Sequence, residues 1–236
     1  MLYWEYYLMG IVLLPGIILS IWAEIKVSST FAKYSKVLGA KNLTGAEVAQ
    51  KILSHNNLSN VAVRRVSGEL TDNYNSRTNV VSLSDSVYDS PTISALGVAA
   101  HECGHAIQYA NNYGPIKFRK FVGVMSNISS KLLWPLIIVG LILGIGVNSP
   151  YGNIMLWSGI IFFGLSALFS LITLPVELNA SKRALKALVE VDALDEMEVI
   201  GAKKVLNAAA LTYVAALVMS MLELLRFILV FAKRDD

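Results

Sequence analysis

Long apolar stretches alternate with polar segments along the chain. Four of these stretches are long enough to form membrane-spanning helices, because a bilayer core of roughly 30 Å needs about 20 helical residues. They cover residues 3–23, 132–147, 154–174 and 213–232. The pattern therefore predicts a mainly α-helical, multi-span membrane protein with two polar segments between the spans.

The polar segments divide the chain into five parts. We expect a first transmembrane helix, a polar domain, a transmembrane hairpin, a polar helical segment, and a fourth membrane helix with a tail, at residues 1–23, 24–131, 132–174, 175–212 and 213–236. Both polar segments are rich in Lys and Arg, whereas the linker at 148–153 contains neither. Cationic loops stay in the cytoplasm, so we expect both polar segments on that side of the membrane.

The fourth apolar stretch contains two ionisable residues, Glu223 and Arg226, which lie three apart on one helical face. Ionisable groups at membrane depth are costly and are usually paired. We therefore expect either that the two side chains neutralise each other or that this helix lies partly in the membrane interface.

The composition supports a membrane protein and argues against two other classes. The hydrophobic fraction is 55% and the charged fraction is 16%, whereas soluble domains average about 45–50% and about 25%. The net charge of +3 is too small to indicate a nucleic-acid partner. Cys103 is the single cysteine, so an intrachain disulfide cannot form.

The first polar segment mixes helical and strand patterns. Thr44 and Glu47 have the spacing of a capping box, which marks the start of a helix that should end near residues 56–57. Alternating apolar positions predict strands at 60–66 and 79–84, separated by a turn-rich stretch. We therefore expect this segment to form a small α+β domain.

The helix expected after the second strand carries the densest chemistry of the chain. Ser90 should be its N-cap, Pro91 should occupy its first helical position, and Ala110 should lie near its end. The stretch HECGH, at residues 101–105, falls in the middle of this helix.

His101 and His105 of this stretch are four residues apart, so they share one helical face and can direct two ring nitrogens at one ion. Glu102 is rotated by about 100° from His101, so its carboxylate can reach a water on that ion without being a ligand. Zinc held by three protein groups keeps one position for water and lowers the pKa of that water. We therefore expect Zn²⁺ as the cofactor and Glu102 as the general base, with Cys103 as a buried packing residue and His55 as a surface residue.

The third metal ligand must come from elsewhere in the chain. No histidine follows His105, so a ligand further along the chain must be acidic. The candidates are Glu177, Glu190, Asp192, Asp195, Glu196 and Glu198. The last five form an acidic run of the kind that is typical of a solvated helix face. Glu177 is favoured because it stands among small and apolar neighbours where the third span ends, although a helix N-terminal carboxylate that meets the helix dipole would give the same pattern.

These segments together resemble a known family. The stretches "TNVVSLSDSVYDSPTISALGVAAHECGHAIQ", "LPVELNASKRAL" and "LNAAALTYVAALV" resemble the bacterial membrane zinc metallopeptidases, also called neutral zinc metallopeptidases, over nearly the whole chain. The chain is more distantly similar to the HtpX-like and CAAX-prenyl membrane proteases. The resemblance implies a small gluzincin-like zinc domain in the bacterial inner membrane, facing the cytoplasm, with ligands His101, His105 and Glu177 and base Glu102. Ser181 departs from the pattern of related gluzincins, in which an Asp often orients a ligand histidine.

The predicted function is hydrolysis of peptide bonds in membrane-associated or misfolded proteins by a membrane-embedded zinc endopeptidase. The alternative is a non-proteolytic zinc-binding adaptor or assembly factor in a membrane complex, which the intact Glu102 disfavours. The expected partners are a polypeptide substrate, the lipid bilayer, and either a membrane partner or further copies of the chain. No nucleic acid is expected.

The strand at 79–84 is the predicted binding site for the polypeptide substrate. We expect it to be an exposed edge strand beside the metal that pairs with an extended peptide through backbone hydrogen bonds. The residues that would make these bonds are Asn79, Val80, Val81 and Ser82.

Overall fold

The structure is a computed structural model that describes residues 10–143 and 150–232. The chain forms two compact units. The helical unit comprises Met1–Trp22, Lys117–Leu174 and Tyr213–Asp236, and the mixed unit comprises Ala23–Ile116 and Pro175–Thr212. Most described residues are helical, as the apolar pattern predicts.

The helical unit is formed by parts of the long helices α2 (Leu14–Tyr34), α6 (Gly114–Leu141), α7 (Pro150–Glu190) and α8 (Glu196–Ala232). Three helical segments within the described ranges are long and apolar enough to cross a membrane, namely Gly114–Gly140, Trp157–Glu190 and Glu196–Leu229. They overlap the second, third and fourth predicted spans. The first predicted span begins within residues 1–9, which lie outside the described residues, so it stays a prediction.

Small and hydroxyl-bearing side chains mediate helix contacts inside the helical unit, as is usual between membrane helices. Ser126 Oγ lies 3.2 Å from Ser166 Oγ, and Ser170 Oγ lies 3.2 Å from Ser220 Oγ. The two ionisable residues of the fourth stretch form an ion pair, with Arg226 Nη2 at 2.9 Å from Glu223 Oε2. This agrees with the first of the two expected arrangements, mutual neutralisation.

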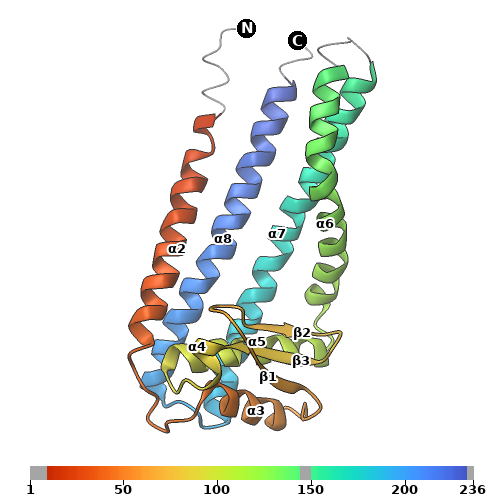
Figure 1. The fold of residues 1–236 in the computed structure, drawn as a ribbon. Coiled ribbons are helices and arrows are strands. Elements are labelled where there is room, and N and C mark those ends of the chain that lie inside the picture. The colour runs from red at the N-terminus through yellow and green to blue at the C-terminus, as the bar shows by residue number, and fades with distance from the viewer. Residues whose placement is uncertain (1–9, 144–149, 233–236) are drawn as a thin grey trace. The chain divides into compact units, whose positions relative to one another are not determined.

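The mixed unit contains a three-stranded sheet of β1 (Ala62–Val66), β2 (Asn73–Asn75) and β3 (Val80–Ser84), in the order β1-β3-β2 (Figure 1). Strand β3 pairs in parallel with β1 and antiparallel with β2. The prediction that residues 79–84 form an edge strand is therefore wrong.

The error in the edge-strand prediction has a simple physical cause. The short strand β2 lies within the turn-rich stretch, where three residues are too few to show an alternating pattern. Because Val80, Val81 and Ser82 already pair with strands on both sides, and Asn79 O accepts from Ala62 N, the backbone here cannot take up a substrate strand. We therefore withdraw these four residues as the substrate-binding set.

The core of the mixed unit lies between the sheet and the helices α3 (Gly45–His55), α4 (Asp85–Tyr88) and α5 (Ile93–Ala110), joined by the C-terminal part of α7. Its largest fully buried apolar side chains include Ile52, Leu53, Leu83, Leu96 and Leu188. Helix α3 begins with the predicted capping box, in which Thr44 and Glu47 bond reciprocally. Helix α5 carries HECGH in its middle, also as predicted.

The start of α5 lies two residues later than predicted. Thr92, not Ser90, is the N-cap, and its side chain accepts a hydrogen bond from Ala95 N. Pro91 lies before the helix because its carbonyl accepts from Gly39 N while Thr92 forms a β-bridge with Leu38. These long-range bonds hold the backbone extended where the local signal alone would start a helix.

Two side chains in this unit lie where the sequence suggests. Cys103 is fully buried, and its Sγ is 3.6 Å from the carbonyl oxygen of Ala49, to which the thiol donates. Burial raises the pKa of the Cys103 thiol, which keeps it protonated and makes it a packing residue. His55 is exposed at the end of α3.

Candidate metal centre

Three predicted ligands converge within the mixed unit. Helix α5 presents His101 and His105 one turn apart, and α7 presents the buried side chain of Glu177. Glu177 Oε2 lies 3.1 Å from His101 Nε2 and 3.4 Å from His105 Nε2. The three candidate ligand atoms all lie within 4.8 Å of one another, so the residues are positioned to bind one metal ion.

The geometry of these side chains fits zinc. Zinc takes imidazole nitrogen and carboxylate oxygen at about 2.0–2.2 Å in a tetrahedral arrangement, which places neighbouring ligand atoms about 3.3 Å apart. The distances of 3.1 and 3.4 Å between Glu177 and the two histidines match this edge length. Within residues 10–143 and 150–232 three side chains form this cluster, and such a set would leave a fourth position for water, which is the pattern of catalytic rather than structural zinc sites.

The close approach of α5 to α7 depends on Gly104, the fourth letter of HECGH. A Cβ atom at this position would lie only 2.5 Å from the carbonyl oxygen of Ala180 on α7. No side chain larger than hydrogen fits there, so this glycine allows Glu177 to reach the two histidines. Gly97, on the same helix, differs because its Cβ would lie 3.6 Å from Ala202 Cβ, an ordinary contact.

These two glycines give a matched pair of variants. We expect Gly104→Ala to push α5 and α7 apart, to destabilise the fold by about 1–3 kcal/mol through overpacking, and to weaken zinc binding. Gly97→Ala should be neutral or stabilising, because Ala is the better helix former by up to about 1 kcal/mol. Thermal unfolding and zinc content of the purified variants are the measurements. Equal zinc binding by the two variants would contradict this role for Gly104.

Each ligand histidine has a partner at its other ring nitrogen. His101 Nδ1 lies 3.2 Å from Ser181 Oγ, and His105 Nδ1 lies 3.0 Å from Gln108 Oε1. Partners of this kind fix the ring orientation, so that the Nε2 atoms face Glu177. Ser181 thus occupies the position at which the resemblance suggested an Asp. Gln108 is not among the residues predicted from the sequence, where its only signal is a polar residue one turn after His105 in an apolar stretch.

Glu102 lies beside the ligands and is largely buried, with 9% of its surface exposed. Burial raises the pKa of its carboxyl above the usual value. The nearby His101 and His105 oppose this rise in the pKa of Glu102. The negative charges of Glu177 and Asp72 add to it. A carboxylate whose pKa is raised accepts a proton more readily, which suits a general base.

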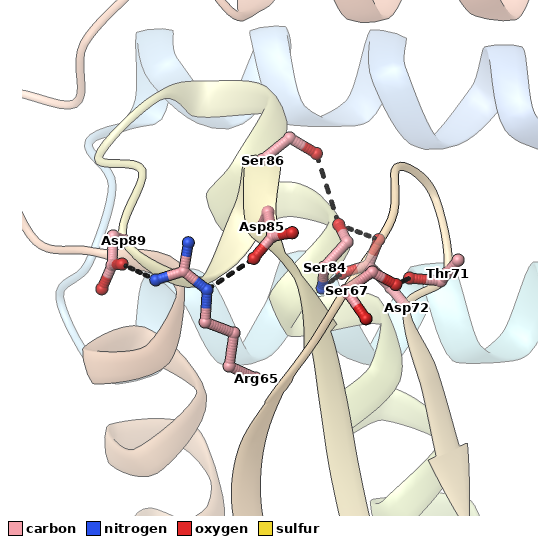
Figure 2. A network of polar contacts seen from close by, with 8 residues as sticks. All are labelled: Arg65, Ser67, Thr71, Asp72, Ser84, Asp85, Ser86 and Asp89. Atoms are coloured by element: carbon pink, nitrogen blue, oxygen red, sulfur yellow. Dashed lines mark hydrogen bonds and ion pairs between the residues drawn. The ribbon is translucent and has the colours of Figure 1, made fainter.

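Asp72 is a second residue near this centre that the sequence pattern does not predict. Its two carboxylate oxygens accept hydrogen bonds from the backbone N and from the Oγ of Ser84, both at 2.8 Å. Figure 2 shows these bonds beside a second cluster, in which Arg65 donates to Asp85 and Asp89. Asp72 therefore fastens the loop before β2 to the end of β3.

The other acidic candidates make surface contacts instead. Asp192 pairs with Lys41, and Glu190 pairs with Lys186 at 3.2 Å. Glu198 Oε2 accepts from the backbone N of Asp195 at 2.9 Å. Among the described residues, the acidic run from 190 to 198 contributes nothing to the metal cluster, which agrees with a solvated face.

Comparisons with known proteins point to one family. The profile of the family described as "Putative neutral zinc metallopeptidase" matches residues 9–232. The chain is also 44% identical over 218 residues to the "Putative membrane protease YugP" of Bacillus subtilis (strain 168), a match that covers 92% of this chain and 94% of that protein. No solved structure matches the chain.

Proposed function

Because the chain belongs to the neutral zinc metallopeptidase family and is a membrane protein, we propose that it is a membrane-embedded, zinc-dependent endopeptidase of gluzincin type. The observation that carries this proposal is the convergence of His101, His105 and Glu177, with Glu102 beside them on the same helix. The family supports protease activity and polypeptide substrates in general, and these four residues supply the specific chemistry.

Each residue has a distinct role in the proposed mechanism. His101, His105 and Glu177 would hold zinc, which when bound lowers the pKa of a water and polarises the substrate carbonyl. Glu102 takes the proton from the attacking water and then delivers it to the leaving amine. Ser181 holds the ring of His101 during these steps through its contact with Nδ1.

The substrate is expected at the outer edge of β2, since β3 is paired on both sides. Strand β2 lies against the metal-bearing helix, with the rings of Tyr74 and Tyr109 at 5.7 Å between centroids. A polypeptide that pairs with Asn73–Asn75 would run beside α5 and would be held mainly through its backbone. A peptide carrying a photoreactive group should then label residues 73–75 and leave the outer edge of β1 unlabelled.

The proposed setting is the bacterial inner membrane, with several spans and with the metal centre on the cytoplasmic side. The Lys- and Arg-rich character of both polar segments supports this orientation. Glu177 follows the end of the third predicted span by three residues in the sequence. We therefore expect membrane-associated or misfolded polypeptides to be cut in preference to dilute soluble ones.

The alternative of a non-proteolytic zinc adaptor is not favoured. A structural zinc site is normally closed by four protein ligands and needs no base. Here three ligands are grouped, and Glu102 stands next to them.

Chelation tests the proposal directly. The purified protein in detergent or lipid should cleave casein, lose this activity when zinc is removed with a chelator, and regain it when zinc is returned. The rate should fall to background in the chelated sample, because the open metal position supplies the attacking water. Cleavage that continues unchanged in chelator would overturn the zinc mechanism, and absence of cleavage with zinc bound would favour the adaptor.

A further inference from the structure

We propose that Gln108 is a positioning residue that locks His105 in the tautomer able to bind metal, and that Asn179 and Arg183 fix the direction of the Gln108 amide. The inference deepens the proposed function, since it concerns the same metal centre. It rests on a chain of hydrogen bonds in which each donor and acceptor is determined by the next.

The buried amide of Gln108 makes three contacts. Its Nε2 donates to Val176 O at 2.8 Å and to Asn179 Oδ1 at 3.0 Å, while its Oε1 lies 3.0 Å from His105 Nδ1. The side chain is fully buried, so each of these groups needs its partner. The backbone carbonyl of Val176 can only accept, so the nitrogen of Gln108 must face it, and the oxygen must face His105.

Arg183 fixes the next amide in the same way. Its Nε donates to Asn179 Oδ1 at 2.8 Å, and a guanidinium has donors only. Asn179 must therefore turn its oxygen towards Arg183, and that same oxygen accepts from Gln108 Nε2. If the Asn179 amide were flipped, its NH2 group would face two other donors, Arg183 Nε and Gln108 Nε2. Arg183 therefore fixes the orientation of the Asn179 amide, and Asn179 in turn fixes the orientation of the Gln108 amide.

The consequence falls on His105. Because Gln108 Oε1 can only accept, His105 Nδ1 must carry a proton, and in the neutral ring His105 Nε2 then presents a lone pair. His105 Nε2 lies 3.4 Å from Glu177 Oε2. A proton on Nε2 can join these two groups, and a metal ion that replaces this proton finds Nε2 already directed at Glu177.

The other ligand histidine provides an internal contrast. His101 Nδ1 contacts the hydroxyl of Ser181, and a hydroxyl can donate or accept. Its tautomer is therefore not dictated by its partner. Gln108 also bonds the backbone of Val176, the residue before Glu177, so one side chain ties both ligand-bearing helices together before metal arrives.

Nitrogen-15 NMR of zinc-free protein labelled at histidine tests the tautomer, because the chain has only three histidines. We expect the parental His105 to show a protonated Nδ1. In Gln108→Met, which keeps the size but removes all three bonds, this signature should be lost and zinc affinity should fall by about 10- to 100-fold. Gln108→Glu keeps an acceptor for His105 and should retain the Nδ1–H signature, although it loses both donor contacts to Val176 O and Asn179 Oδ1 and should be less stable. Gln50→Met, at an exposed site on α3, is the matched control and should change neither readout.

An unchanged His105 tautomer and unchanged zinc affinity in Gln108→Met would overturn the inference. So would loss of the Nδ1–H signature in a folded Gln108→Glu protein. If neither variant folds, the parental spectrum decides, because a parental His105 without a protonated Nδ1 would also overturn the inference. Failure of the parental protein to cleave any polypeptide would contradict the proposed function but would leave both of these readouts intact.

Discussion

Glu102→Gln should abolish peptide-bond hydrolysis while zinc stays bound. The substitution keeps the size of the side chain and leaves His101, His105 and Glu177 in place, so the metal cluster should persist. Glutamine cannot take a proton from the attacking water, and loss of a positioned general base lowers rates by about 10²- to 10⁴-fold. The measurement is the initial rate of casein cleavage together with zinc per chain.

The matched control for this variant is Glu196→Gln, an exposed carboxylate in the first turn of α8. It should keep both the parental rate and the parental zinc content. If Glu102→Gln cleaves at the parental rate, Glu102 is not the general base. Loss of zinc from Glu102→Gln would instead indicate that Glu102 is a ligand and would contradict the ligand set His101, His105 and Glu177.

Glu177→Gln should lose both zinc and activity. A neutral amide is a poor zinc ligand, and the two histidines alone would leave two coordination positions open. The metal joins α5 to α7, so its loss should also lower stability. Zinc at one hundred times its dissociation constant stabilises a one-site protein by about 2.7 kcal/mol, and this increment should be missing in the variant. Thermal unfolding with and without added zinc measures it.

Glu190→Gln provides the comparison, because Glu190 lies on the same helix but pairs with Lys186 at the surface. It should bind zinc and unfold as the parental protein does. Full zinc occupancy in Glu177→Gln would mean that another group is the third ligand, and it would contradict the proposed metal centre.

The local features of this site could be predicted because they depend on helical periodicity. The spacing of His101 and His105 places them on one face of any helix, and the structure has that helix. Thr44 and Glu47 likewise interact over three residues, within the reach of a local signal. Glu177 could be reached by elimination, since the chain has no histidine after His105 and few carboxylates among apolar neighbours.

The features that escaped prediction depend on contacts between distant segments. The central position of β3 follows from pairing with β2, which is too short to leave a periodic pattern. Asp72 meets Ser84 twelve residues away, and Gln108 meets Asn179 seventy-one residues away. Neither contact has a spacing that the sequence reveals, because each is set by how the helices and the sheet pack.

X-ray absorption at the zinc edge of the purified, zinc-loaded protein tests the central claim most directly, that one zinc ion is held by His101, His105 and Glu177. The account predicts one zinc per chain, with only nitrogen and oxygen neighbours at about 2.0–2.2 Å and scattering from two imidazole rings. A sulfur neighbour at about 2.3 Å, or scattering from fewer than two imidazoles, would contradict it.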